Sequence, residues 1–327
     1  MEILEEALVL CKFGKFHVLL LFATFCALLA SVMVTTTSSY ILPIAECDLD
    51  MSILGKGVLT AMPFVGQVGA ALLTGFITDA FGRKMFLVGG NIGMFICTIL
   101  EGSSQNYWVL IFGKCMEGIF LSLCFTATLV MVPEFTHKNV RDRALLFSAS
   151  FMSMSLIVVA LISWGMLPQN WDFVIWDGYF ELHSWNIYLY ACSIWGLLAS
   201  ILYCYLPESP KFLLSHGYER EALEVLRQVY SINTGKSKET FPITSLLPAS
   251  AKKTQEKMRH NTSFKKQLTE GMFEVKNLFR QPLLTRLLLF LFMNFVCLFS
   301  YTSLRLWYPQ ISTIIESYQN KNGDSAR

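Results

Sequence analysis

Three short stretches of the sequence place a carboxylate near a cation where a long apolar run ends. The first stretch contains Asp79, the second Glu134 and the third Glu208. Such groups can pair at a water boundary and separate again when the helix ends that carry them move apart. Each stretch alone is also typical of an interfacial anchor, but together they predict a charged latch that gates one end of a helical bundle. Its residues are Gly75, Asp79, Gly82, Arg83, Lys84, Glu134, Arg141, Glu208 and Lys211.

A fourth signal lies inside an apolar run, where Lys114 and Glu117 are three residues apart. A charge within the membrane costs about 2.5–3.5 kcal/mol on insertion scales, so it is a functional candidate by default. Two interpretations stay open. Three-residue spacing on a helix allows the two side chains to pair and cancel much of this cost. Alternatively, both side chains line a cavity that binds a solute.

Motifs for catalysis are absent from the sequence. It has no Walker loop, no G-x-G-x-x-G, no G-x-S-x-G and no pair of histidines at zinc spacing. All the cysteines except Cys47 lie in or beside apolar runs, where Cys packs as a small hydrophobic residue. We therefore expect no enzyme activity, no disulfide, no cofactor and no metal site.

The composition is that of a membrane protein. Of 327 residues, 54% are hydrophobic and only 15% are charged, against about 25% charged in a soluble domain. The net charge of +2 gives no reason to expect nucleic acid as a partner. Apolar runs longer than about 18 residues indicate membrane-spanning helices, because a helix satisfies its own backbone groups in lipid.

Runs free of charge, or nearly so, predict an all-α polytopic bundle with seven transmembrane helices. We expect these helices between Lys15 and Glu46, Lys56 and Asp79, Lys84 and Glu101, Tyr107 and Val132, Arg143 and Asp172, Glu181 and Glu208, and Arg286 and Arg305.

Basic residues concentrate in alternate loops, which predicts a cytoplasmic N-terminus and a cytoplasmic latch. Lys56 is the one exception on the opposite side. The loop from Pro168 to Trp185 is acidic and aromatic, and we favour anchoring at the outer interface over ligand binding as its role. The aromatic anchors in this loop are Trp171, Trp176, Tyr179, Phe180 and Trp185.

The sequence divides into three parts: a six-helix bundle at 1–206, a cytoplasmic loop at 207–281, and a seventh helix with a short tail at 282–327. Within the loop, the spacing of apolar residues predicts an amphipathic helix from Glu219 to Tyr230, lying on the membrane or on the bundle. The following basic stretch is either a solvated linker, which we favour, or a contact with anionic lipid.

The three latch stretches together resemble the major facilitator superfamily, whose patterns are G-x-x-x-D-x-x-G-R-K after helix two, E-x-x-x-x-x-x-R after helix four and P-E-S-P-[RK] after helix six. Gly14-Lys-Phe-His17, Leu42-Pro-Ile-Ala-Glu-Cys-Asp-Leu49 and Leu306-Trp-Tyr-Pro309 are similar to the synaptic vesicle glycoprotein 2 family and its insect relatives. Lys114 stands where the superfamily has arginine, and helix one has no acidic residue from Leu28 to Thr35.

The resemblance implies twelve helices in two halves that rock around a central site. With seven spans, the chain is expected to be a truncated form or to pair with a second chain that supplies the missing half. Helices one, four and seven help to line the cavity in the superfamily. The candidate cavity residues are therefore Thr35, Thr36, Lys114, Glu117, Asn294, Tyr301 and Arg305.

The function expected from this resemblance is secondary-active transport of a small organic solute or ion by alternating access. The alternatives are a non-transporting membrane scaffold or vesicle protein that binds partners through its cytoplasmic loop, and a truncated inactive fragment. In each case the protein is multi-pass and in contact with membrane lipid, in the plasma membrane or an intracellular vesicle.

Overall fold

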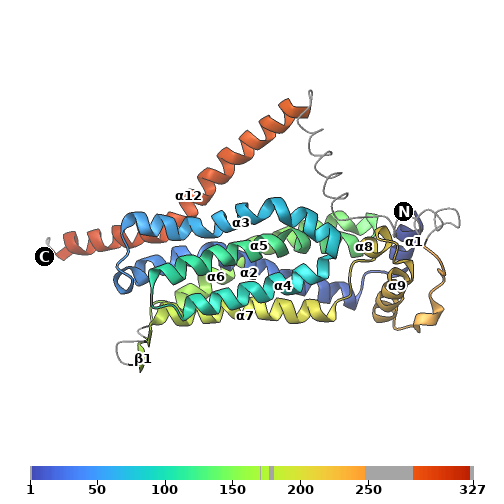
Figure 1. Ribbon diagram of the computed structural model, residues 1–327, viewed down its shortest axis with the longest axis horizontal. Helices are drawn as coiled ribbons and strands as arrows, with labels where there is room; N and C mark the ends of the chain where they lie inside the picture. Colours follow the sequence, from blue (N-terminus) through green and yellow to red (C-terminus); the bar gives the residue numbers. More distant parts are fainter. Residues whose placement is uncertain (1, 170, 177–179, 247–282, 325–327) are drawn as a thin grey trace.

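The computed structural model describes residues 2–169, 171–176, 180–246 and 283–324, which form a bundle of long helices (Figure 1). Within these residues, seven helices are long and apolar enough to cross a membrane, which confirms the predicted all-α fold class and number of spans. They are α2 (Lys15–Asp48), α3 (Ile53–Phe81), α4 (Arg83–Gly102), α5 (Tyr107–Phe135), α6 (Lys138–Met166), α7 (Ser184–Tyr205) and α12 (Leu283–Asp324).

The remaining elements lie at the two ends of the bundle (Figure 1). One end, here called the hinge end, carries Gly82 between α3 and α4, together with α1 (Glu2–Leu10), α8 (Pro210–Ser215) and α9 (Glu219–Thr234). The short helix η1 (Lys238–Thr240) follows α9. The opposite end, the hairpin end, carries strands β1 (Phe173–Trp176) and β2 (Phe180–Leu182). They pair antiparallel, with Phe173 opposite Leu182.

Glycines set the close packing of α3 against α5. A Cβ atom at Gly66 on α3 would overlap the carbonyl oxygen of Cys115, and one at Gly118 on α5 would overlap that of Pro63. Since backbone meets backbone at both points, neither residue can carry a side chain without moving a helix. This crossing fixes the register of α5, which carries the intramembrane charges.

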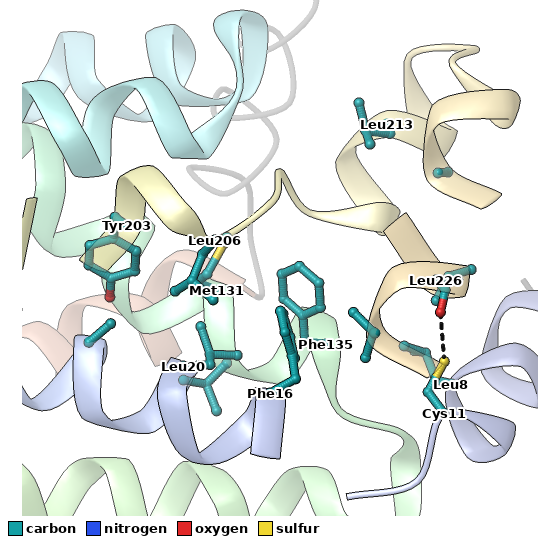
Figure 2. Packing of buried hydrophobic residues seen from close by; sticks show 14 of the residues in the cluster. Leu8, Cys11, Phe16, Leu20, Met131, Phe135, Tyr203, Leu206, Leu213 and Leu226 are labelled. Atoms are coloured by element: carbon teal, nitrogen blue, oxygen red, sulfur yellow. Dashed lines mark hydrogen bonds between the residues drawn. The ribbon is translucent and has the colours of Figure 1, made fainter. Parts of the chain in front are cut away.

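The predicted amphipathic helix is α9, and it packs on the bundle. Leu226 on α9 is fully buried, and its carbonyl oxygen accepts a hydrogen bond of 3.4 Å from the Cys11 thiol (Figure 2). The Asn233 amide binds the start of α2, accepting from the Phe16 N–H at 3.0 Å and donating to the Cys11 carbonyl at 3.0 Å. Figure 2 shows Phe16 against Phe135, whose ring centroids are 5.0 Å apart. The hinge end is therefore closed by an apolar core.

The seventh span differs from the other six. Its first half leans away from the bundle (Figure 1), and its most apolar window buries no residue. The sequence predicts a span that ends at Arg305, but α12 continues through Pro309 to Asp324. Proline removes one backbone hydrogen bond, a loss that membrane helices tolerate more readily than soluble ones.

Candidate functional site

The turn between α3 and α4 consists of one residue, Gly82, with a φ angle of 94°. Residues with a side chain rarely adopt this left-handed region. A Cβ atom here would also lie 2.7 Å from the Oε2 atom of Glu208. Gly82 therefore serves both the turn and the approach of the Glu208 carboxylate.

Glu208 caps the start of α4. Its carboxylate accepts hydrogen bonds from the backbone N–H groups of Arg83 at 3.2 Å and Lys84 at 3.0 Å, and from its neighbour Ser209 at 2.9 Å. The first N–H groups of a helix have no partner within the helix and carry partial positive charge, so a carboxylate is well placed there. The stretch after α7 is thereby tied to the start of α4.

The side chains of Arg83 and Lys84 contact two other helices. The Arg83 guanidinium forms an ion pair with Glu134 at the end of α5, where the glutamate side chain is only 4% exposed. The Lys84 ammonium donates to the carbonyl oxygen of Cys204 on α7 at 2.9 Å. Three helices therefore meet at the start of α4. We call Gly82, Arg83, Lys84, Glu134 and Glu208 the hinge cluster.

Arg141 forms a second group of contacts at this end. Its guanidinium donates to the carbonyl oxygens of Pro133 at 3.0 Å and Thr136 at 3.1 Å, and pairs with Glu5 on α1 at 2.7 Å. Burial would raise the pKa of Glu5, but the hydrogen bond and charge of Arg141 outweigh it and lower this pKa. Sequence reasoning missed Glu5, because the acidic N-terminus gave no sign that it forms a helix against the bundle.

The structure describes only the backbone of two predicted latch residues. The backbone at Gly75 and Asp79 belongs to α3, but the side-chain environment of both positions is outside the described residues. Lys211 is exposed, and within the described part of the chain it forms no ion pair. The cation expected to pair with Glu208 is replaced by backbone N–H groups of α4. The gating role of these residues stays a prediction.

The intramembrane charges form one buried cluster. The Lys114 ammonium lies 2.7 Å from the carboxylate of Glu117 on the same helix and 2.7 Å from that of Glu101 on α4. Lys114 also donates to the Thr37 hydroxyl of α2 at 3.0 Å. Lys114 and Glu101 have 0% of their side chains exposed, and Glu117 has 2%. These three residues are the buried charge cluster.

Sequence reasoning did not find Glu101. The sequence predicts a charge-free run that ends at Glu101, although a span from Arg83 needs about 20 residues and so includes position 101. Gly113 provides the space, since a Cβ atom there would lie 2.6 Å from Cγ of Glu101. Two features of the sequence could have indicated that Glu101 lies inside the span near Lys114: the required span length and the glycine beside Lys114.

The other predicted cavity residues do not join this cluster. Thr35 and Thr36 donate their hydroxyls to the Val32 carbonyl of their own helix, and Thr37 contacts Lys114 instead. On α12, Asn294 donates to the Phe290 carbonyl at 2.9 Å. Tyr301 is 52% exposed and lies under the Arg305 guanidinium, 5.6 Å from ring centroid to Cζ. Their role as cavity residues stays a prediction.

The hairpin end contains further polar contacts. Lys56, the exceptional cation on this side, pairs with Glu46 at 2.5 Å and is buried. Trp185 is also buried and donates its indole N–H to Asp48 at 2.8 Å, so its predicted role as an interface anchor is wrong. The indole packs inside the bundle because this hydrogen bond satisfies its polar atom. Trp176, Tyr179 and Phe180 have side chains outside the described residues.

His183 lies beside three carboxylates at the hairpin end. It is 2.9 Å from Asp172, 3.8 Å from Asp48 and 4.0 Å from Glu181. The hydrogen bond to Asp172 raises the pKa of His183; burial opposes this shift, and the other two carboxylates add to it. The end of α2, the hairpin and the start of α7 therefore meet at one histidine.

Known proteins similar to this chain are membrane transporters and synaptic vesicle glycoproteins. The model of a family described as sugar (and other) transporter matches residues 13–308. The chain belongs to this family. Human synaptic vesicle glycoprotein 2B is 24% identical over 95% of the chain, and human synaptic vesicle glycoprotein 2A is 26% identical over 72%. These relatives confirm the similarity to the synaptic vesicle glycoprotein 2 family.

Solved structures place the chain in the major facilitator fold. The partially occluded inward-open form of the xylose transporter XylE from E. coli has a TM-score of 0.57 at 14% identity, covering 79% of this chain and 60% of that one. Its complex with 6-bromo-6-deoxy-D-glucose also has a TM-score of 0.57, at 15% identity, covering 75% of this chain and 53% of that one. The present chain is a multi-pass integral membrane protein. Its matches span 47% of human synaptic vesicle glycoprotein 2B and 32% of human synaptic vesicle glycoprotein 2A.

Proposed function

We propose that the chain is a secondary-active transporter of a small organic solute, working by alternating access. The hinge cluster carries this proposal: Arg83, Glu134 and Glu208 hold the ends of three helices together through an ion pair and backbone hydrogen bonds. Water can replace each contact when the hinge end opens, so the end can close and open without unfolding its helices. The core beneath it, around Phe16 and Phe135, gives the moving parts a rigid base.

A solute or ion gradient supplies the energy in this proposal, since the sequence has no ATP-binding motif. Xylose is the first solute to test, because the similar solved structures carry that name. The chain spans about half the length of human synaptic vesicle glycoprotein 2B and of the solved xylose transporter, so any protein that co-purifies with it is included in the test.

The test is uptake of labelled sugars, amino acids and organic cations into proteoliposomes that contain the full chain, with and without any protein that co-purifies. We expect uptake of one solute class that Arg83→Gln reduces severalfold and Lys236→Gln leaves unchanged, at equal amounts of inserted protein. Lys236 is the matched control, because it is an exposed cation just after α9, at the same end, and is not a latch residue. Absence of uptake across the panel in both preparations would reject transport and favour a membrane scaffold.

A further inference from the structure

The buried charge cluster is not balanced when all its groups are ionised. Lys114 carries one positive charge and lies 2.7 Å from each of two carboxylates, those of Glu101 and Glu117. Among the described residues, no second cation pairs with either carboxylate. The fully ionised cluster therefore has a net charge of −1 in an almost completely buried site, where an uncompensated charge is strongly unfavourable. One added proton makes the cluster neutral.

Hydrogen bonding distinguishes the two carboxylates. Both oxygens of Glu117 are used, since Oε1 is 2.6 Å from the Thr98 hydroxyl and Oε2 accepts from Lys114 at 2.7 Å. The hydroxyl has one proton, which also faces the Met94 carbonyl at 2.8 Å. The shorter distance to Glu117 makes this carboxylate the stronger acceptor of the two. Two donors on one carboxylate favour its ionised form.

Glu101 lacks this support. Its Oε2 atom faces Lys114, whereas its Oε1 atom is buried and has no hydrogen-bond partner within the described structure. Leaving a buried oxygen unpaired costs less for a neutral carboxyl group than for a carboxylate. We propose that Glu101 binds one proton, and that Glu101, Lys114 and Glu117 together form a proton-binding site between α4 and α5.

The surroundings contain no further charge in the described residues, but they do contain titratable groups. Cys97 on α4 and Cys192 on α7 lie within electrostatic range of the cluster, and the Tyr188 phenol is in contact with Cys192. A small cavity of about 10 Å³ among α2, α4 and α7 has Glu117 in its lining, close to the space that one water molecule needs. One water molecule in this cavity would lie beside Glu117.

Proton binding changes the pairing of Lys114. When Glu101 is ionised, the ammonium is held between α4 and its own helix; when Glu101 is neutral, the remaining ion pair lies within α5. The contact between these two helices is therefore stronger in the deprotonated state. That this change couples proton binding to solute movement rests on the proposed transport function. The proton binding itself does not rest on it.

Infrared spectroscopy of the full chain in lipid, at about pH 7, tests the site without any transport assay. A protonated carboxyl group gives a carbonyl band that shifts in D2O, and we expect one such band in the parent protein. Glu101→Gln should remove it. Glu117→Gln should remove it as well, because Lys114 and Glu101 then form a neutral pair. Glu6→Gln, at an exposed carboxylate, should leave the band unchanged.

Lys114→Met gives an independent outcome in the opposite direction. Without the ammonium, both carboxylates are buried without a counter-charge, so the band should grow about twofold. The proposal is overturned if the parent protein has no band, or if the band persists in Glu101→Gln at parental intensity. The two proposals fail separately. Solute uptake without this band contradicts proton binding only, and the band without solute uptake contradicts transport only.

Discussion

The guanidinium of Arg83, at the start of α4, forms an ion pair with the carboxylate of Glu134, at the end of α5. Four-fifths or more of each side chain is buried, at 16% and 4% exposure. Removal of either partner takes this ion pair away in a site that water hardly reaches, and the Glu134 carboxylate is the more deeply buried of the two. This pair is therefore the contact at the hinge end whose loss the protein should tolerate least.

We expect Glu134→Gln to lower the free energy of unfolding by about 3 kcal/mol, the lower end of the range for a broken buried pair, because Arg83 keeps some exposure. The melting temperature in detergent, followed by circular dichroism, measures this loss. Asp142→Asn, at an exposed carboxylate nearby, is the control and should change little. The double variant Arg83→Gln/Glu134→Gln should lose less than the sum of the single variants; additive losses would mean that the two residues do not interact.

Gly82→Ala should destabilise the protein more than Gly235→Ala. Both glycines have positive φ angles, 94° and 71°, so alanine is strained at either position by about 1–3 kcal/mol. Only at Gly82 does the new Cβ atom also meet a carboxylate, that of Glu208; nothing lies within 4 Å at Gly235. The same thermal assay measures the difference. Equal losses would show that the Glu208 cap is not tight.

Gly118→Ala tests the crossing of α3 and α5. Its Cβ atom would overlap the Pro63 carbonyl, so the helices must separate, at a cost of about 1–3 kcal/mol or more. Gly69→Ala on α3 is the matched control, because nothing lies within 4 Å of its Cβ position. We expect the control to stabilise α3 by about 0.5–1 kcal/mol. A neutral result for Gly118→Ala would contradict the close approach of these two helices.

The His183 site predicts a pH dependence. Because the pKa of His183 is raised, first by the hydrogen bond to Asp172, the folded state binds the proton more tightly than the unfolded state. This stabilisation is complete below the unfolded pKa of about 6.5 and is lost as pH rises through the folded value. The melting temperature should therefore fall more steeply between about pH 6 and pH 8 in the parent than in His183→Gln. Parallel curves would exclude the histidine as the cause.

The sequence by itself determined the membrane class, the seven spans and the family. Apolar runs of sufficient length cross lipid as helices, because a helix satisfies its own backbone groups there. The three latch stretches in combination are specific for the family. It also determined that Lys114 and Glu117 can pair, because residues three apart on a helix are neighbours whatever surrounds them.

Tertiary structure alone decided which partners come from other helices. Glu101 reaches Lys114 because the α3–α5 crossing fixes how deep α5 sits and Gly113 leaves space for the side chain. Glu208 binds the backbone of α4 and not Lys211, because helix-terminal N–H groups lie within its reach. The spacing along one chain cannot specify such contacts: they depend on the relative depth and rotation of separate helices, which packing between their surfaces sets.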